Sequence, residues 1–484
     1  MRVAPVHPEQ RAASSAYGVS AMDVFTALQT AVSGLKAQSY ALDNISGNIA
    51  NSQTTGYKRI DTSFVDLIAE QTPRREVAGS VGAYSQLTNT IQGNLSSTGV
   101  ATNMALNGEG FFVVQKKTTD AAGTTSFSGS NLYTRRGDFA QDKDGYLANG
   151  AGSYLTGQTL DPITGTTTST GPIKISNSIL PAKATTSITY SANLPKSPTT
   201  TNTTSTAGSE LLGTFADGSD ARITSGTGTG TVSSTNSQSF IDSSISGPSL
   251  TVYTTAGSPV SLQTRWAKVQ NADSTSTPAT NDTWNLFYAD KSSVTGSNTS
   301  WTNAGQAFTF NASGQLTSPA STAITIPNLT VDGASVGNIS LNYGAGGLTE
   351  YASTTGKVTT NTLQQNGYAS GTLNTVEVTE DGKIMGTYSN GTTVALASVD
   401  VVNFTNDDGL RPDSLGNYQQ TSASGAPIAG LRTSTVVGGN IEQSNTDIAG
   451  EFSKMIVTQQ AYSANTRVMS TAQTMMSDLM NIIR

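Results

Sequence analysis

Residues 448–484 read IAGEFSKMIVTQQAYSANTRVMSTAQTMMSDLMNIIR. Apolar side chains recur here every seven positions, and further apolar side chains lie between them: Ile448, Met455, Tyr462, Met469, Met476 and Ile483, flanked by Phe452, Val468, Met475, Leu479 and Met480. A seven-residue apolar repeat is typical of a helix that packs along other helices. The stretch therefore predicts a C-terminal helix of about 36 residues, about 54 Å long at 1.5 Å per residue.

A second apolar stripe lies near the N-terminus, from residue 24 to about residue 51. Its members also recur every seven positions, with others beside them: Leu28, Leu35, Leu42 and Ile49, with Phe25, Val32 and Ile45. The pattern predicts an amphipathic helix that starts near Met22, with Asp23 as a possible N-cap. Residues 1–21 show no helical or strand period. Two interpretations stay open for them: a disordered extension, or a misassigned start with Met22 as the true first residue.

Both stripes could belong to ordinary core helices of a globular domain, but their positions at the two ends of the chain favour another interpretation. Burying the apolar side chains of the C-terminal stripe yields about 20 kcal/mol at roughly 2 kcal/mol each. Ordering about 36 residues opposes this with roughly 50 kcal/mol before hydrogen bonds are counted. We therefore expect the ends to be largely disordered in a free subunit and to fold when copies pack together.

The middle of the chain has a different pattern. Short apolar runs predict antiparallel strands at residues 111–114, 250–253, 260–266, 284–288, 308–310 and 376–378. Asp144-Gly145, Asp381-Gly382 and Asn390-Gly391 are typical hairpin turns. Residues 164–170, 197–209 and 225–239 are rich in Ser, Thr and Gly and predict loops or exposed edges.

These patterns predict a mainly β protein of antiparallel domains, whose N- and C-terminal helices pair in a coiled-coil-like domain. We expect a helical domain from residues 22–75 and 436–484, and an inner β domain from residues 76–165 and 356–435. Residues 166–355 are expected to form one or more outer β-rich domains.

The composition offers little for catalysis. The chain has no Cys, and its one His is His7, so thiolate chemistry and His-based acid–base catalysis or metal binding are not expected. A net charge of -7 and the lack of a basic stripe argue against a nucleic-acid partner. No apolar run is long enough for a membrane span, and no secretory signal is expected. Asp142, Asp144 and Gly145 lack the later Glu of a calcium loop and favour a hairpin turn instead.

Residues 48–58 read NIANSQTTGYK and end the N-terminal helix; their key positions are Asn48, Ala50, Asn51, Thr55, Gly56, Tyr57 and Lys58. Asn and Gly at a helix end allow a left-handed exit. Residues 107–112 (NGEGFF), 133–139 (YTRRGDF), 365–371 (QNGYASG), 404–410 (FTNDDGL) and 440–447 (NIEQSNTD) follow in this order. As a set they resemble the axial proteins of the bacterial flagellum, and residues 365–371 and 404–410, together with residues 388–391 (YSNG), resemble hook proteins more than generic rod proteins. Asn103, Thr446 and Gln460 depart from the family pattern.

The resemblance implies a structural subunit, exported through the flagellar type III apparatus without cleavage, that polymerises outside the cell. It implies a curved, flexible tube that transmits torque from rod to filament, without enzymatic activity or cofactor. Its partners would be copies of itself, the distal rod protein, the hook cap, the hook-junction protein and the export apparatus. The expected polymer interface comprises Leu28, Leu35, Leu42, Ile49, Ile448, Phe452, Met455, Tyr462, Met469, Met476 and Ile483. A distal rod or junction protein is the alternative, and a secreted adhesin or glycan-active enzyme is a distant one.

Overall fold

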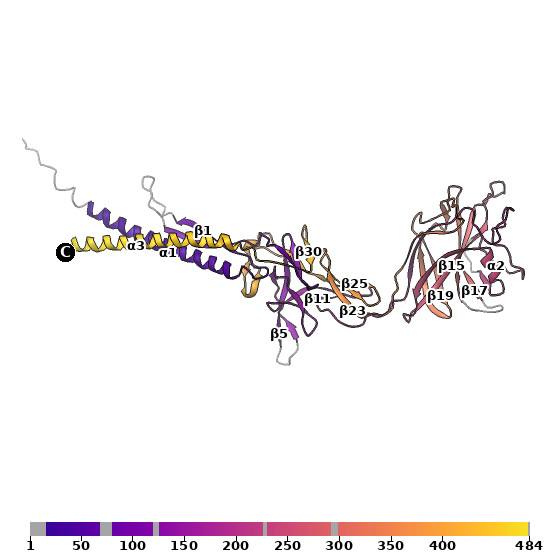
Figure 1. Cartoon of the computed structure of the whole chain (residues 1–484), viewed down its shortest axis with the longest axis horizontal. Helices are drawn as coiled ribbons and strands as arrows, with labels where there is room; N and C mark the ends of the chain where they lie inside the picture. Colours follow the sequence, from indigo (N-terminus) through magenta and orange to yellow (C-terminus); the bar gives the residue numbers. More distant parts are fainter. Residues whose placement is uncertain (1–15, 68–79, 120–124, 226–229, 292–298, 483–484) are drawn as a thin grey trace, which may run out of the picture. The chain divides into compact units, whose positions relative to one another are not determined.

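The computed structural model describes residues 16–67, 80–119, 125–225, 230–291 and 299–482. The chain forms two compact units. The terminal unit comprises residues up to 177, residues 375–386 and residues from 393 onward, and the insert unit comprises residues 178–374 and 387–392. The prediction of mostly antiparallel strands with a helix at each end of the chain is confirmed (Figure 1).

The two long helices lie side by side and antiparallel (Figure 1). They are α1 (Ala16–Ala50) and α3 (Ile448–Ile482), and α3 matches the predicted helix to within one residue at its end. Asn48 near the end of α1 contacts Glu451 near the start of α3, whereas Gly34 lies against Asn465 further along. The Asp447 side chain caps α3, because its Oδ1 accepts a hydrogen bond from the Ala449 N–H at 3.1 Å.

Helix α1 begins earlier than predicted. It includes Met22 and Asp23 in its interior, so the expected start near Met22 and the N-cap at Asp23 are wrong. The apolar stripe marks only the part of the helix that packs against other residues. Once a helix has formed, each further residue adds one hydrogen bond, so the helix extends beyond that part at little cost in free energy. Residues 16–21 contain no proline to stop it. The remaining residues of the predicted extension, 1–15, lie outside the described residues.

The described part of the terminal unit also contains three two-stranded sheets. A hairpin of β1 (Ile60–Leu67) and β2 (Ser80–Leu87) packs on α1, where the Val81 N–H donates to Ser33 Oγ at 3.3 Å. The other two sheets pair β3 (Leu95–Ser97) with β31 (Asn440–Glu442), and β4 (Met104–Asn107) with β30 (Thr435–Gly438). Both join segments more than 300 residues apart, so the two chain ends build one body together.

A fourteen-stranded sheet follows, centred on the long strand β5 (Phe111–Thr119). Its main path runs β23 (Leu373–Val378), β24 (Lys383–Tyr388), β25 (Thr393–Val399), β10 (Ser153–Leu160), β5, β7 (Leu132–Thr134), β28 (Asn417–Gln419), β27 (Arg411–Pro412). The side strands are β6 (Thr125–Phe127), β8 (Phe139–Gln141), β9 (Leu147–Asn149), β11 (Thr167–Pro172), β26 (Val401–Asn403) and β29 (Ile428–Ala429). Two short 3-10 turns, η1 (Asp407–Gly409) and η2 (Ser414–Gly416), connect its later strands. An aromatic core forms where Phe111 meets Phe404 and Tyr418 edge to face.

The insert unit contains two sheets that enclose a shared core. One sheet contains β12 (Ser187–Asn193), β19 (Ala323–Val331), β20 (Ala334–Asn342), β21 (Leu348–Thr349) and β22 (Thr359–Gln365), in which β12 pairs in parallel with β20 and β21. The other contains β13 (Thr231–Ser233), β14 (Ile245–Tyr253), β15 (Pro259–Gln270), β16 (Asp282–Ala289), β17 (Thr299–Phe310) and β18 (Leu316–Ser318). Trp266, Trp284 and Phe308 are fully buried in the core.

The predicted strands and hairpin turns are confirmed, since every predicted strand lies inside an observed one. Residues 167–170 belong to the exposed edge strand β11, which agrees with the prediction of loops or exposed edges. The described part of the segment at residues 225–239 departs from that prediction only in its helix. It contains the edge strand β13 and the start of α2 (Ser237–Asp242), whose Phe240 is fully buried. One large apolar residue just beyond the polar stretch therefore anchors a helix that composition alone conceals.

A buried charged cluster links the two sheets of the insert unit. Lys268 Nζ lies 2.8 Å from Asp282 Oδ1 and 3.3 Å from Glu350 Oε1, and the Trp284 indole N–H donates to Glu350 at 2.8 Å. All three charged side chains are at least nine-tenths buried. Burial raises the pKa of Glu350 to about 7, although the hydrogen bond from Trp284 and the charge of Lys268 oppose the shift.

This raised pKa predicts that the insert unit becomes less stable as the pH rises. The folded state holds the Glu350 proton more tightly than the unfolded chain, so the stabilisation is complete below about pH 4.5 and lost by about pH 7, with a slope of at most about 1.4 kcal/mol per pH unit. All three tryptophans, Trp266, Trp284 and Trp301, lie in the insert unit, so their fluorescence during urea unfolding reports on this unit. Glu350→Gln should flatten the profile between pH 5 and 7. An unchanged slope in that variant would assign the dependence to other groups.

Candidate assembly surface

The helices α1 and α3 pack through small side chains. Ala31, Ala37, Ala41 and Ile45 of α1 are buried, and Gly34 lies so close to α3 that a Cβ there would approach Asn465 Nδ2 to 2.9 Å. This spacing of three and four residues is one face of a helix. The small residues allow the two helix backbones to approach closely, so the contact is narrow and leaves most of α3 uncovered.

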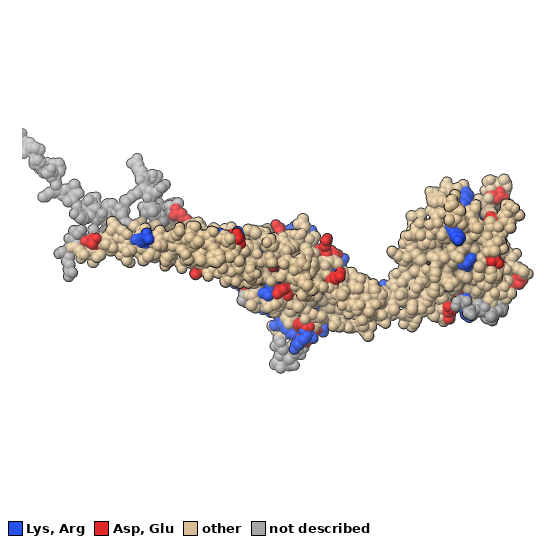
Figure 2. Space-filling view, viewed as in Figure 1, with Lys and Arg blue, Asp and Glu red and all other residues tan. Residues whose placement is uncertain are grey.

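The uncovered part of α3 is apolar. Fourteen of the twenty-one large apolar side chains that are exposed in the described residues lie on α1, α3 and the β1–β2 hairpin: Phe25, Val32, Tyr40, Phe64, Val65, Tyr84, Ile448, Phe452, Ile456, Val457, Tyr462, Val468, Met475 and Met480. The insert unit contributes only Ile179 and Tyr351. Few charges lie on the visible face of the helix pair (Figure 2). Such a concentration of exposed apolar surface is typical of an interaction site.

The predicted interface residues divide between the two sides of the helices. Ile448, Phe452 and Tyr462 are exposed, whereas Met455, Met469 and Met476 are half-buried along the face of α3 that carries the α1 contact. Leu28, Leu35, Leu42 and Ile49 are also half-buried, and Ile483 lies outside the described residues. An α-helix turns about 20° less than two full turns in seven residues, so a seven-residue stripe drifts around an undistorted helix.

The strict repeat missed the two most exposed apolar side chains in the first half of α3. Ile456 and Val457 are 56% and 65% exposed. Neither belongs to the seven-residue series, which contains their neighbour Met455. Successive residues on a helix point about 100° apart, so Ile456 and Val457 point away from the direction of Met455. An apolar residue that falls outside an otherwise regular stripe was the available signal.

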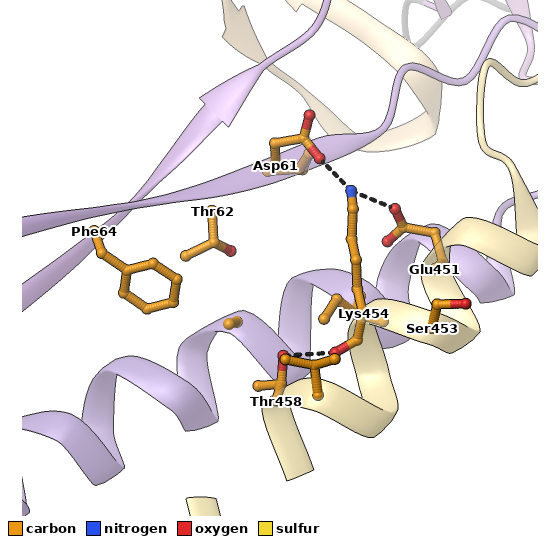
Figure 3. A pocket seen from close by; sticks show the side chains of 11 residues that line it. Asp61, Thr62, Phe64, Glu451, Ser453, Lys454 and Thr458 are labelled. Carbon is orange, nitrogen blue, oxygen red and sulfur yellow. Dashed lines mark hydrogen bonds and ion pairs between the residues drawn. The ribbon is translucent and has the colours of Figure 1, made fainter. Parts of the chain in front are cut away.

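A groove of about 550 Å³ runs between α1, α3 and β1 (Figure 3). Phe64 and Val457 contribute apolar walls, and Lys454 reaches across it, 2.9 Å from Asp61 Oδ1 and 2.8 Å from Glu451 Oε1. Burial works to raise the pKa of Asp61, but the hydrogen bond and charge of Lys454 outweigh it and the pKa is lowered. The carboxylate therefore stays ionised and ties the hairpin to α3.

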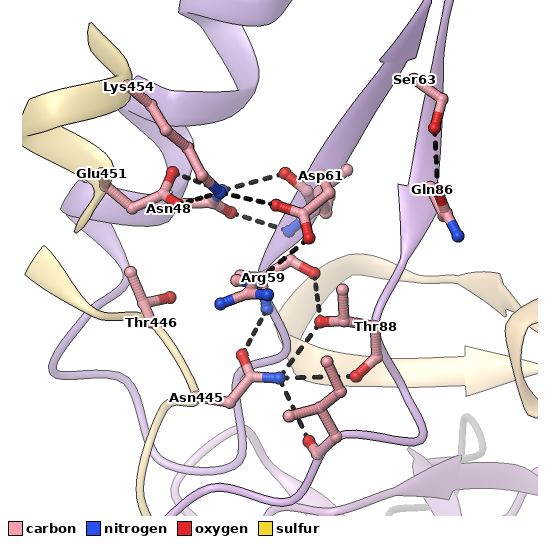
Figure 4. A network of polar contacts seen from close by, with 12 residues as sticks. Asn48, Arg59, Asp61, Ser63, Gln86, Thr88, Asn445, Thr446, Glu451 and Lys454 are labelled. Atoms are coloured by element: carbon pink, nitrogen blue, oxygen red, sulfur yellow. Dashed lines mark hydrogen bonds and ion pairs between the residues drawn. The ribbon is translucent and has the colours of Figure 1, made fainter.

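Two asparagines connect the end of α1, residues 51–60 that follow it, and the segment before α3 (Figure 4). We call this region, residues 48–60 and 442–451, the joint. Asn48 is almost fully buried; its Nδ2 donates to the Ile60 carbonyl and to Glu451 Oε2, and its Oδ1 accepts from the Ile60 N–H and the Tyr57 hydroxyl. Asn445 accepts from the Arg59 N–H at 2.8 Å and donates to Thr88 and Ile91. A side-chain amide has both donors and an acceptor, which explains why Asn suits each position.

A buried ion triad lies partly within this joint. Lys58 Nζ contacts Glu442 Oε1, and Arg135 Nη1 lies 3.3 Å from Glu442 Oε2. The carboxylate also accepts the Gly93 N–H at 2.8 Å. Burial lowers the pKa of Lys58, and the attraction of Glu442 offsets part of that shift. One carboxylate thus neutralises two cations from distant segments. The buried contact with Glu442 explains why the motif has a lysine at position 58.

The other motif residues shape the exit from α1. Asn51 folds back, and its Nδ2 donates to the Gly47 carbonyl at 2.9 Å. Gly56 has a φ of +66°, and its N–H donates to the Glu442 carbonyl at 2.7 Å. Thr55 is half-buried near this turn, and Ala50 is exposed at the helix end. The motif therefore forms a tight structural joint beside the exposed helix face.

Gly56→Ala should destabilise the terminal unit by about 2–3 kcal/mol or more. A Cβ at Gly56 would lie 2.7 Å from the Arg136 backbone N, in addition to the strain of a left-handed alanine. Gly152→Ala is the matched control, because Gly152 also has positive φ but nothing lies within 4 Å of its added Cβ; we expect about 1 kcal/mol there. Hydrogen exchange of terminal-unit peptides along a urea series measures both. Equal losses would show that the close approach at Gly56 relaxes freely.

The described residues contain no cluster of three or more His, Asp or Glu side chains that could hold a metal ion. No helix among them is long and apolar enough to cross a membrane.

Four family descriptions match successive parts of the chain. They are the flagella basal body rod protein at residues 28–58, the flagellar hook protein FlgE/F/G D1 domain at 105–193, the flagellar basal body protein FlaE D2 domain at 227–368, and the flagellar basal body rod FlgEFG protein C-terminal at 437–482. The flagellar hook protein FlgE of Brucella abortus is 28% identical over 96% of this chain and 100% of its own length. The chain is similar to flagellar hook proteins along nearly its whole length.

Other hook proteins agree along nearly the whole chain. The flagellar hook protein FlgE of Salmonella typhimurium is 29% identical over 93% of this chain and 98% of its own, and that of Escherichia coli is 28% identical over 94% and 100%. A crystal structure of the Helicobacter pylori flagellar hook protein FlgE2 aligns with 70% of this chain and 98% of that chain, at a TM-score of 0.48 and 18% identity.

The hook-family matches coincide with the features described above. The rod-protein match covers the second half of α1 and ends at Lys58 of the buried triad. The C-terminal match covers Glu442 and all of α3, and the D2 match lies within the insert unit.

Proposed function

We propose that this chain is the structural subunit of a flagellar hook, which polymerises through its terminal helices into a curved, flexible tube and transmits torque from rod to filament. The exposed apolar face of α3 carries the proposal. Ile456, Val457, Val468 and Met475 are all about half exposed or more, and α1 covers only the opposite side of the helix. A 35-residue helix with this face uncovered needs neighbours, and a second copy offers the same face.

The two units have separable roles in this proposal. The terminal unit supplies the contacts that give the tube its continuity, because it holds almost all the exposed large apolar side chains. The insert unit presents a polar surface to the medium or to neighbouring inserts. Polar, water-bridged contacts exchange at low free-energy cost, which suits a joint that bends as it turns.

Several finer assignments belong to the same proposal. The partners are copies of this chain, with the distal rod protein, hook cap and hook-junction protein at the ends of the tube. The location is outside the cell, after export through the flagellar apparatus without a cleaved signal. The subunit has no catalytic role; its ionisable groups in the joint are engaged in structural pairs such as Lys58 with Glu442.

Electron microscopy of the purified chain tests this function. The full chain should form tubes, whereas a chain without residues 448–484 should stay monomeric or form irregular aggregates. The tryptophan fluorescence of the insert unit provides the control, because this unit should unfold at the same urea concentration in both chains. A full chain that remains monomeric under conditions where hook proteins polymerise would contradict the proposal.

A further inference from the structure

Leu415 combines a strained backbone with an exposed apolar side chain. Its φ of 72° and ψ of 21° lie in the left-handed region, where the Cβ of any residue but glycine crowds the following carbonyl oxygen. The side chain is 60% exposed. For a bulky residue this conformation is an outlier, and a strained residue persists only where the surroundings or a function require it.

The turn that carries Leu415 is firmly anchored. The Asp413 N–H donates to the Asn417 carbonyl at 2.7 Å, and the Thr134 hydroxyl donates to the Gly416 carbonyl at 3.0 Å. Asn417 is fully buried and its Nδ2 donates to Ser153 Oγ at 3.0 Å. These bonds hold the turn in place, so the side chain projects at a fixed point.

The other positive-φ residues differ from Leu415. Three further residues besides glycine have positive φ in the described part of the chain: Asn328, Asp332 and Arg432. Asn and Asp tolerate this region well. Arg432 is exposed, but its charged end is compatible with water. Among these four residues, Leu415 alone places an exposed large apolar side chain on a strained backbone, and both the exposure and the strain are unfavourable for the free subunit.

Leu415 borders an open groove of about 400 Å³ that also includes Pro412 and residues 54–57 of the joint. The charged groups of this groove are already paired, since Asp413 lies 2.7 Å from Lys116, and Arg136 lies 2.7 Å from Asp138. The groove therefore offers an apolar contact rather than a site for a charged ligand. Residues 54–57 lie just beyond the end of α1 at Ala50, so the groove belongs to the terminal unit, which the proposed function assigns to assembly.

We propose that Leu415 is a self-assembly contact that inserts into the surface of a second copy of this chain. The proposal rests on the proposed function, because it requires a polymer. Burial of the side chain in the polymer compensates for the strain that the free subunit bears. Leucine at this position thus lowers the stability of the subunit and raises that of the assembly.

Leu415→Gly tests the proposal because it separates the two effects. Glycine relieves the strain and removes the apolar side chain, so the urea midpoint of the terminal unit should rise while the critical concentration for assembly increases about tenfold, measured by sedimentation. Leu415→Asn should act in the same direction, since Asn tolerates positive φ. Leu415→Met keeps an apolar side chain and should assemble nearly as the native chain does.

Arg432→Gly is the matched control, because it relieves strain at another exposed turn without removing an apolar side chain. It should stabilise the subunit and leave the critical concentration unchanged. An unchanged critical concentration in both Leu415→Gly and Leu415→Asn would overturn the proposal, as would a fall in subunit stability in both. If the native chain forms no polymer, the proposed function fails and this inference fails with it; a native polymer with unaffected variants refutes this inference alone.

Discussion

Glu442→Gln is expected to lower the free energy of unfolding of the terminal unit by about 3–5 kcal/mol. Glu442 is fully buried and is the carboxylate that contacts both Lys58 and Arg135. A glutamine has nearly the same shape and leaves the packing intact, but the two cations then remain buried without their anion. The loss should appear as faster hydrogen exchange in β3, β31 and the start of α3, and as a lower urea midpoint for those peptides.

Two controls separate this effect from a general loss of charge. Lys383→Met removes a similar contact, 2.7 Å from Asp381, but both side chains there are about half exposed, so the expected loss is under about 1 kcal/mol. Tryptophan fluorescence should show the insert unit unfolding unchanged in both variants. A loss under about 1 kcal/mol for Glu442→Gln would mean that water reaches the two cations and that the triad is not a sealed structural element.

Replacing Ile456 and Val457 together by glutamine should abolish tube formation at concentrations where the native chain polymerises. Both side chains are more than half exposed in the subunit, so polar replacements there change its stability by no more than about 0.5 kcal/mol. In a polymer the same side chains would be buried, at about 1.5 kcal/mol or more each. The sum corresponds to roughly a 100-fold rise in the critical concentration, which sedimentation measures directly.

Ser463→Gln with Ser470→Gln is the matched control for that variant. Both serines are exposed on α3, and the replacements add volume but take away no apolar surface. This control should polymerise close to the native concentration. If the Ile456 and Val457 variant forms tubes as readily as the native chain, the outward face of α3 is not the assembly surface, and the interface must lie on the half-buried stripe of Leu28, Leu35 and Leu42.

The sequence predicted the elements whose residues are neighbours in the chain. The seven-residue repeat located α3 almost to the residue, and the turn pairs located three hairpins, because periodicity and turn chemistry are local properties. The start of α1 was missed because a helix extends beyond the face that it packs. The outward-facing Ile456 and Val457 were missed because the repeat describes an idealised supercoil rather than the actual turn of α3.

The buried partnerships could not be predicted. Lys58 stood out in the N-terminal motif and Arg135 in a second one, but nothing in either motif indicates that both contact Glu442, which follows 384 residues after Lys58 and 307 after Arg135. The same holds for Asn48 and Glu451. Pairings of this kind depend on the final packing of distant segments, and a single sequence carries no signal for them.

The pairing of the two chain ends also sets an order of events for a chain that emerges N-terminus first. Strands β3 and β4 find their partners β31 and β30 only after about residue 442 has emerged, and α1 finds α3 later still. All residues of the insert unit have been synthesised once residue 392 is available. This unit can therefore fold before residues 1–177 meet the C-terminal part of the terminal unit. Closing so long a loop is slow but adds little to the free-energy cost, because the entropy of closure grows only with the logarithm of length. The helix pair with its exposed apolar face therefore forms only after α3 has been synthesised.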